Sequence, residues 1–230
     1  MRLQTLASLA LALVLVSTVP ANAENFILMD YSGYAYETGG LGDGLPSDIG
    51  DVLVLTGVAD TYDDLFGVQP SSQEVTVYIY DLVSDGGVVD GEFLRIAYSG
   101  GKIAVYEDAV LNHDWGTNPP NPELSTFTDG QLLFEGDFTR FNLDLKIAGS
   151  SGVGAGAYSG DIDGVGGTAA QLCDGAEDCA YTFGGAFSKP IAVQLPDGYD
   201  IQIAGTLEVD AAVPVGPAGS FSAIKSLYQN

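Results

Sequence analysis

The residues best suited to binding a ligand lie in one long segment without strand character, from Asp108 to Gly130. It contains the consecutive residues His113, Asp114 and Trp115, and the chain has no other histidine or tryptophan. A tryptophan ring offers a flat apolar face to a sugar, and polar neighbours supply hydrogen bonds. The triplet therefore predicts a carbohydrate-binding loop. The alternative is that Trp115 anchors the loop to the domain and that His113 is solvated.

Two tyrosines on a predicted strand extend this candidate site. In the range 74–80 the aliphatic residues occupy every second position, which is the period of a β-strand. Tyr78 and Tyr80 share the opposite face from those residues, because successive side chains of a strand point to opposite sides. We expect both rings on the solvent side, where they are available to a sugar.

Two acidic, glycine-rich segments are candidate calcium loops. One contains Asp43, Asp48 and Asp51, and the other contains Asp161 and Asp163. Hard cations such as calcium prefer several carboxylate and carbonyl oxygens on a flexible loop. Neither segment has a complete calcium-loop spacing, so ordinary Asp-Gly turns are the alternative. Calcium is the one cofactor that the sequence suggests.

Cys173 and Cys179 enclose a short acidic segment, and they are the only cysteines. In an oxidising compartment such a pair predicts a disulfide that fixes one loop. Zinc is disfavoured because a structural site needs four ligands and the single histidine is distant in sequence.

No catalytic signature is present. A Ser-His-Asp mechanism would have to use His113, and the chain has no G-x-S-x-G motif. Glycoside hydrolysis needs only two carboxylates at a set separation, but the sequence cannot select a pair from 31 acidic residues. The sequence therefore favours a non-catalytic protein, and a carboxylate-based hydrolase remains the enzymatic alternative.

The N-terminus has the pattern of a cleavable signal peptide. Arg2 precedes an apolar run from Leu6 to Val16, and the small-residue triplet Ala21-Asn22-Ala23 follows. The apolar run is shorter than the roughly 20 residues that span a membrane. We expect residues 1–23 to be removed, so that the mature chain begins at Glu24, has no transmembrane anchor, and is secreted to the periplasm, the cell surface or the medium.

The charge of the chain narrows the class of partner. Seven Lys and Arg residues stand against 31 Asp and Glu residues, for a net charge of −24. Such a charge repels nucleic acid and anionic lipid and attracts cations. Nucleic acid is therefore excluded as a partner, while polysaccharide and cell-surface or matrix components remain.

The alternating pattern predicts an all-β domain over residues 24–211, an antiparallel β-sandwich or barrel-like sandwich of about nine strands. Ser99-Gly100-Gly101 predicts a hairpin turn between two of these strands, because glycine tolerates the positive φ of tight turns. The nine predicted strands cover residues 51–58, 74–80, 92–98, 102–107, 132–139, 141–147, 153–162, 180–187 and 201–209.

The C-terminus differs in composition from the domain. Residues 212–219 form a Pro/Gly linker, and residues 220–230 predict a short amphipathic tail. Its apolar stripe and adjacent residues are Phe221, Ile224, Lys225, Leu227 and Tyr228. This ending resembles the Trp-Gly-x-Ile-Lys-x-Leu-Tyr-Arg ending of uncharacterised bacterial secreted proteins, although Phe221 replaces the Trp. The resemblance implies a shared terminal tag; a frayed helix is the alternative.

Together these patterns favour an exported, non-catalytic β-domain that serves as a structural or adhesive module at or outside the cell surface, with possible calcium support. A carbohydrate-binding module is the second hypothesis, and a secreted carboxylate hydrolase is the third. Exposed aromatic residues on one face would favour the second hypothesis over the first.

Overall fold

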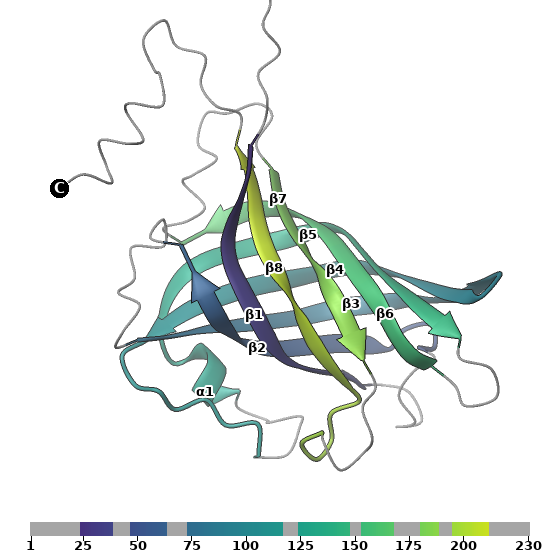
Figure 1. Cartoon of the computed structure of the whole chain (residues 1–230), viewed down its shortest axis with the longest axis horizontal. Coiled ribbons are helices and arrows are strands. Elements are labelled where there is room, and N and C mark those ends of the chain that lie inside the picture. The colour runs from purple at the N-terminus through teal and green to yellow at the C-terminus, as the bar shows by residue number, and fades with distance from the viewer. Residues whose placement is uncertain are drawn as a thin grey trace, which may run out of the picture.

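The computed structural model describes residues 24–38, 47–63, 73–116, 124–147, 153–167, 180–188 and 195–211. These residues form eight strands and one helical turn (Figure 1). The elements are β1 (Glu24–Thr38), β2 (Val52–Tyr62), β3 (Glu74–Asp90), β4 (Phe93–Asp108), α1 (Ser125–Thr128), β5 (Gln131–Ile147), β6 (Val153–Gly166), β7 (Ala180–Ser188) and β8 (Ile201–Ala211).

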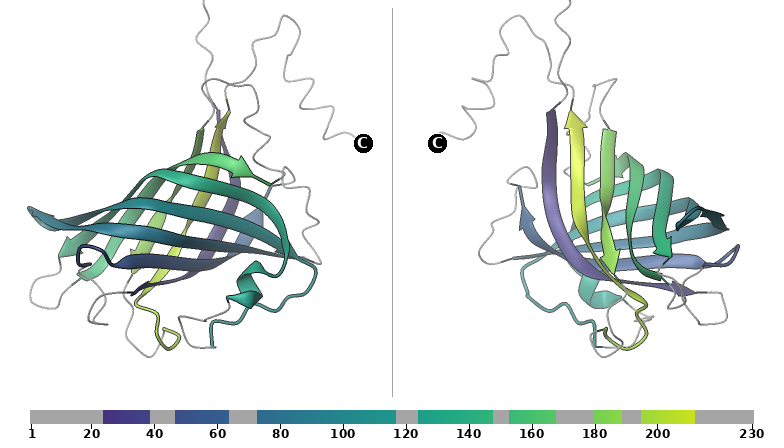
Figure 2. Two further views of the ribbon diagram at one scale, coloured as in Figure 1. Left: turned by 180° about the vertical axis from the view of Figure 1, so that it is seen from behind. Right: turned by 45° about the vertical axis from the view of Figure 1, so that its right-hand side comes forward.

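The strands form a closed antiparallel barrel in which each strand pairs with the next one in sequence. β8 returns to pair with β1, with Phe26 opposite Val209 and Ala35 opposite Ile201, and this pairing closes the barrel (Figures 1 and 2). The predicted all-β antiparallel fold is confirmed. Closure leaves no free edge along the paired lengths of the strands, and so removes the main aggregation hazard of an open sheet.

The predicted hairpin at Ser99-Gly100-Gly101 is wrong. Residues 92–98 and 102–107 belong mostly to one continuous strand, β4. Gly100 and Gly101 have φ values of 66° and 91°, and Asp81 on β3 opposite them has a φ of 59°. β4 keeps its pairing with β3 on both sides of this point, with Tyr80 opposite Lys102 and Leu82 opposite Gly100. The glycines thus mark an irregularity inside a strand instead of a chain reversal.

Two further differences account for the strand count. Residues 132–139 and 141–147, predicted as separate strands, both lie in β5, whose pairing with β6 shifts between Phe138 and Arg140. β1 was not predicted. Its register shifts between Ile27 and Met29 and again between Asp30 and Tyr31, so its apolar residues do not keep a strict period of two.

The barrel interior is filled with side chains, as expected for eight strands. Tyr31 stacks on Phe183 with ring centroids 4.8 Å apart, and the hydroxyls of Tyr31 and Tyr158 are hydrogen-bonded to each other. Gly185 and Gly205 lie opposite each other in the neighbouring wall. A Cβ on either glycine would come within 2.8 Å of the Tyr158 hydroxyl, so these two glycines provide the space for the tyrosine pair.

A second, smaller apolar cluster lies on the outer wall of the barrel. Its members are Tyr36, Val54 and Tyr199, with Tyr34, Val52, Tyr78 and Trp115 packed against them. Figure 2 shows the segment after β4, including α1, outside the barrel. Phe127 of α1 is completely buried, and its carbonyl accepts a hydrogen bond from Thr76 Oγ1 at 2.8 Å. This segment therefore covers the outer wall of β1–β3.

Several sequence predictions concern residues outside the described ranges. These are the signal peptide (residues 1–23), Asp43, the cysteines Cys173 and Cys179, the Pro/Gly linker and the tail. They stay predictions. β1 begins at Glu24, the residue at which the mature chain is predicted to start.

Candidate functional site

Trp115 anchors its loop to the barrel. Its Nε1–H donates to Thr56 Oγ1 at 3.2 Å, and its ring packs edge-on against Tyr34 with centroids 5.1 Å apart. Thr56 is fully buried and also shares a hydrogen bond of 3.1 Å with the Tyr199 hydroxyl. The indole N–H and part of its ring are thus already engaged, so the structure supports the anchoring alternative for Trp115.

His113 is likewise held by the barrel. Its Nδ1 lies against Glu74 Oε2, and its backbone N–H donates to Glu74 Oε1 at 3.1 Å. The same oxygen accepts the N–H of Asn112 at 3.3 Å. Glu74 is buried, so these bonds satisfy a carboxylate that would otherwise be costly to bury. Asp114 is exposed and accepts the N–H of Gly116 at 2.6 Å, closing a local turn.

Tyr78 and Tyr80 lie on the outer wall, as predicted from the strand alternation, and both are partly exposed. Their rings stack with centroids 4.7 Å apart and an interplanar angle of 13°. Tyr78 borders the Trp115 cluster, whereas Tyr80 is one step further from it along β3. The structure therefore brings the two tyrosines together and places the loop triplet beside them.

Tyr106 of β4 joins this pair, because it lies opposite Thr76 and so next to Tyr78 in the β3–β4 register. Burial raises the pKa of Tyr78 to about 12, and Asp81, Tyr80 and Tyr106 add to the shift. Burial also raises the pKa of Tyr80 and of Tyr36, with smaller contributions from Tyr106 and Tyr78 respectively. These hydroxyls therefore stay protonated at neutral pH and can donate as well as accept hydrogen bonds. We call the partly exposed Tyr78, Tyr80 and Tyr106 the tyrosine face.

Charged groups adjoin the tyrosine face on β4 and β5. Tyr80 lies opposite Lys102, and Lys102 lies opposite Asp137 in the barrel register. Lys102 Nζ donates to Asp137 Oδ1 at 2.6 Å, and this hydrogen bond raises the pKa of the lysine. Glu135 lies opposite Ala104, between Lys102 and Tyr106 on β4, and it contributes to the raised pKa of Tyr80 and of Tyr106.

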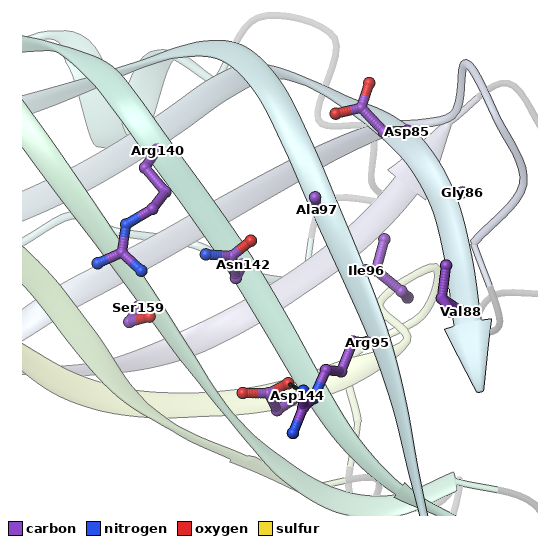
Figure 3. A pocket seen from close by; sticks show the side chains of 10 residues that line it. All are labelled: Asp85, Gly86, Val88, Arg95, Ile96, Ala97, Arg140, Asn142, Asp144 and Ser159. Atoms are coloured by element: carbon purple, nitrogen blue, oxygen red, sulfur yellow. Dashed lines mark ion pairs between the residues drawn. The ribbon is translucent and has the colours of Figure 1, made fainter. Parts of the chain in front are cut away.

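Further along the same wall, β3–β6 enclose a polar cleft of about 470 Å³ (Figure 3). Its floor follows one row of the barrel register, in which Ala97, Asn142 and Ser159 lie side by side. The small side chains of Ala97 and Ser159 keep the floor low. Figure 3 shows Arg95 and Arg140 on two sides of this floor. We call this hollow the polar cleft.

Ion pairs hold the arginines of the polar cleft in place. Arg95 contacts Asp90 at 2.9 Å and Asp144 at 3.3 Å. Arg140 makes a two-pronged contact with Asp161, at 2.7 Å and 3.1 Å, and this contact lowers the pKa of the aspartate. Planar groups such as these, together with the Asn142 amide, present paired donors and acceptors to a ligand rich in hydroxyls.

Every cation in the described part of the chain lies on two adjacent strands. Arg95 and Lys102 are on β4, and Arg140 and Lys146 are on β5. On a protein with a net charge of −24 this gives one wall a mixed charge, whereas the rest of the surface is dominated by acidic residues.

No family model matches the chain, and no curated protein or solved structure matches it either.

The aspartates predicted as calcium ligands have other partners or do not lie together. Asp161 pairs with Arg140, and Asp163 lies opposite Asp137 in the register. Asp51 is buried and accepts the N–H of Asp48 at 2.9 Å, which closes a turn. Within the described ranges, no group of three or more His, Cys, Asp and Glu side chains is placed to hold a metal ion.

Glu37 is a carboxyl group whose pKa is raised, and burial is the main cause. A raised pKa is typical of a general acid. Tyr98 O–H donates to Glu37 Oε1 at 2.6 Å, and the Glu37 N–H donates to Asp200 at 3.1 Å. The hollow beside it has only about 170 Å³ of empty space, too little for a sugar ring with its surrounding groups. Glu37 therefore offers no support for the hydrolase hypothesis.

Sequence reasoning found Tyr78 and Tyr80 but missed Tyr106, Lys102 and the residues of the polar cleft. Most of the missed residues, among them Tyr106, Lys102 and Arg95, sit at outward positions of their strands, so the alternation alone identifies them as solvent-facing. Grouping these residues requires the register between neighbouring strands, which only the structure supplies.

In the part of the chain that the structure describes, no helix is long and apolar enough to cross a membrane.

Proposed function

We propose that this protein is an exported, non-catalytic adhesive module that binds a carbohydrate chain along the outer wall of its barrel. The observation that carries the proposal is the continuous outer surface on β3–β6, with the tyrosine face at one end and the polar cleft at the other. Tyrosine rings supply apolar contact to the C–H faces of sugars, and the polar cleft supplies hydrogen bonds.

The dimensions support a chain rather than a single sugar. Tyr106 and Arg95 lie on the same strand, eleven residues apart, and at a rise of about 3.3 Å per residue this corresponds to roughly 36 Å. Between them lie Lys102 and its ion-pair partner Asp137. A linear oligosaccharide would therefore contact rings, an ion pair and a polar cleft in succession.

The filled interior also supports an outer-wall site. Aromatic side chains occupy the space inside the barrel, so a ligand of the lipocalin kind, held in the barrel lumen, has no room among the described residues. Export remains part of the proposal, and the signal-peptide pattern of residues 1–23 supports it. The Cys173–Cys179 disulfide and calcium support belong to the same proposal and are independent of the glycan site.

Variant proteins test the proposal on a glycan array and by calorimetry. Tyr80→Ala and Tyr106→Ala should each weaken binding by about tenfold, since loss of one aromatic contact is worth roughly 0.5–1.5 kcal/mol beyond area burial. Tyr80→Phe keeps the ring and should retain most of the affinity. Gln202→Ala is the matched control, because Gln202 is exposed on β8, across the barrel from β4.

Two outcomes contradict the proposal. One is a folded wild-type protein that binds no glycan on the array. The other is binding that Tyr80→Ala and Tyr106→Ala leave at the wild-type level. In either case the structural-module hypothesis would be favoured, because it needs no ligand.

A further inference from the structure

The β3–β4 hairpin continues past one end of the barrel. β2 pairs with β3 only up to Val83, whereas β3 continues to Asp90 and remains paired with β4 up to the last pair, Asp90 and Phe93. This hairpin projects clear of the other strands in Figure 1. Val89 of the hairpin lies opposite Leu94, and Leu94 lies opposite Leu145 of β5, on the face that further back lines the core. The core face of the sheet thus continues beyond the barrel.

This extension forms one wall of an apolar hollow of about 730 Å³. Its apolar lining consists of Ile49, Val88, Val89, Leu94 and Ile147. Ile49, Val88 and Val89 are 82%, 67% and 66% exposed, which is unusual for aliphatic side chains gathered in one place. The volume lies within the range of small-molecule sites, and the mouth of a barrel is a common place for them.

Backbone hydrogen bonds hold the wall of the hollow that faces this extension. Gly50 N–H donates to Ser84 O at 2.9 Å, and Ser84 N–H donates to Asp51 O at 2.8 Å. These bonds attach the turn that carries Ile49 to β3. Gly86 makes room for Ile49, since a Cβ at this position would lie 2.6 Å from Ile49 Cγ1. The hollow is therefore a formed feature of the fold and not a gap between mobile side chains.

Among the residues that the structure describes, the charged groups that line the hollow are all carboxylates. They are Asp48 and Asp85, and Ser47 adds a hydroxyl at the floor. Asp85 Oδ1 accepts a hydrogen bond from Ser99 at 3.3 Å, which fixes its direction. With no cation among the described lining residues and a net charge of −24 on the chain, an anionic head group is repelled and a cationic one is attracted.

We infer that this hollow binds amphipathic cations, molecules with an aliphatic or aryl body and an ammonium head. The apolar body contacts Val89, Leu94 and Ile147, which lie on the core face of the sheet, and the ammonium group lies between Asp48 and Asp85. The hollow adjoins the glycan surface: Asp85, Gly86 and Val88 also border the polar cleft, but Ile49, Val89, Leu94 and Ile147 do not. The inference does not depend on the proposed function.

Three probes with the same ten-carbon chain test the inference by calorimetry below their micelle concentrations: decylamine, decanol and decanoate. Decylamine should bind with one equivalent per chain, decanol more weakly and decanoate not measurably. Val89→Ser should weaken decylamine binding by about tenfold, the order expected for removing methyl groups from an apolar pocket. Val165→Ser is the matched control, because Val165 is another exposed strand valine outside the hollow.

The charge requirement is tested by the double variant Asp48→Asn, Asp85→Asn. It should lose the preference for decylamine over decanol while decanol still binds. Three results would overturn the inference: equal binding of decylamine and decanoate, no binding of decylamine, or the same loss of affinity in Val165→Ser as in Val89→Ser. Circular dichroism of each variant shows whether the barrel is intact.

Discussion

Replacement of Thr56 by valine should loosen the loop that carries Trp115. Thr56 is completely buried on β2, and its Oγ1 is the hydrogen-bond partner of both Trp115 Nε1 and the Tyr199 hydroxyl. Valine has nearly the same shape but no hydroxyl. Both partners would therefore lose a hydrogen bond without any change in the packed volume.

The expected cost follows from the burial of the two partners. Leaving a buried polar group unpaired costs about 1–3 kcal/mol. Tyr199 is buried, whereas Trp115 is partly exposed and can turn its N–H toward water. We therefore expect the free energy of unfolding to fall by about 2 kcal/mol, which for a protein of this size lowers the melting temperature by roughly 4–8 °C.

Two measurements check this prediction. Urea denaturation followed by circular dichroism gives the change in free energy. The fluorescence of Trp115, the only tryptophan, reports on the loop itself and should shift to the red in the folded variant. Thr139→Val on the exposed face of β5 is the control and should change stability by less than about 0.5 kcal/mol. A Thr56→Val protein with wild-type stability and emission would refute the reasoning.

Three more predictions concern the barrel interior. Tyr31→Phe and Tyr158→Phe should each lower the free energy of unfolding by about 1–3 kcal/mol, because the hydroxyl of the other tyrosine is left unpaired. The double variant should lose less than the sum of the two single losses. Additive losses in urea denaturation would contradict the hydrogen bond between the two tyrosines. Gly205→Ala should unfold the barrel or lower its melting temperature by more than 8 °C, a loss of at least about 2 kcal/mol, because a Cβ there would lie 2.1 Å from Gly184 O; wild-type melting would contradict this. Burial raises the pKa of Glu37 above its ordinary 4.5, so the folded protein is favoured at low pH and loses stability as the pH rises through that raised pKa. Glu37→Gln should therefore be the more stable protein at neutral pH and lose this advantage below the ordinary pKa; an advantage that does not change with pH would contradict the assignment.

The fold class was readable from the sequence because the strand alternation survives in most of the elements. Range 141–147 shows it fully: Phe141, Leu143 and Leu145 are buried, and Asp144 and Lys146 are exposed. The same signal cannot separate a sandwich from a closed barrel, since both bury one face of every strand. Closure depends on the pairing of β1 with β8. β1 was not predicted, because its bulges interrupt the alternation of apolar and polar residues.

Only part of the candidate site could be predicted from the sequence, for a related reason. Trp115 was identified by its rarity, but residue type could not show that Thr56 and Tyr34, about 60 and 80 residues earlier in the chain, would engage it. Tyr80 and Lys102 are far apart in sequence and become neighbours only through the β3–β4 register. That register includes the irregularity at Gly100 and Gly101, which the sequence presents as a turn.

The most direct test of the proposed glycan surface is an NMR titration of the folded protein with the oligosaccharide that binds best on the array. The account predicts that backbone amide shifts change along one wall, at residues 78–80, 102–106 and 140–144, and that β7 and β8 are unaffected. The shifts at the two ends of this wall should titrate together, because one chain spans both. Shift changes centred on β7 and β8, or the absence of any shift change at saturating oligosaccharide, would contradict the account.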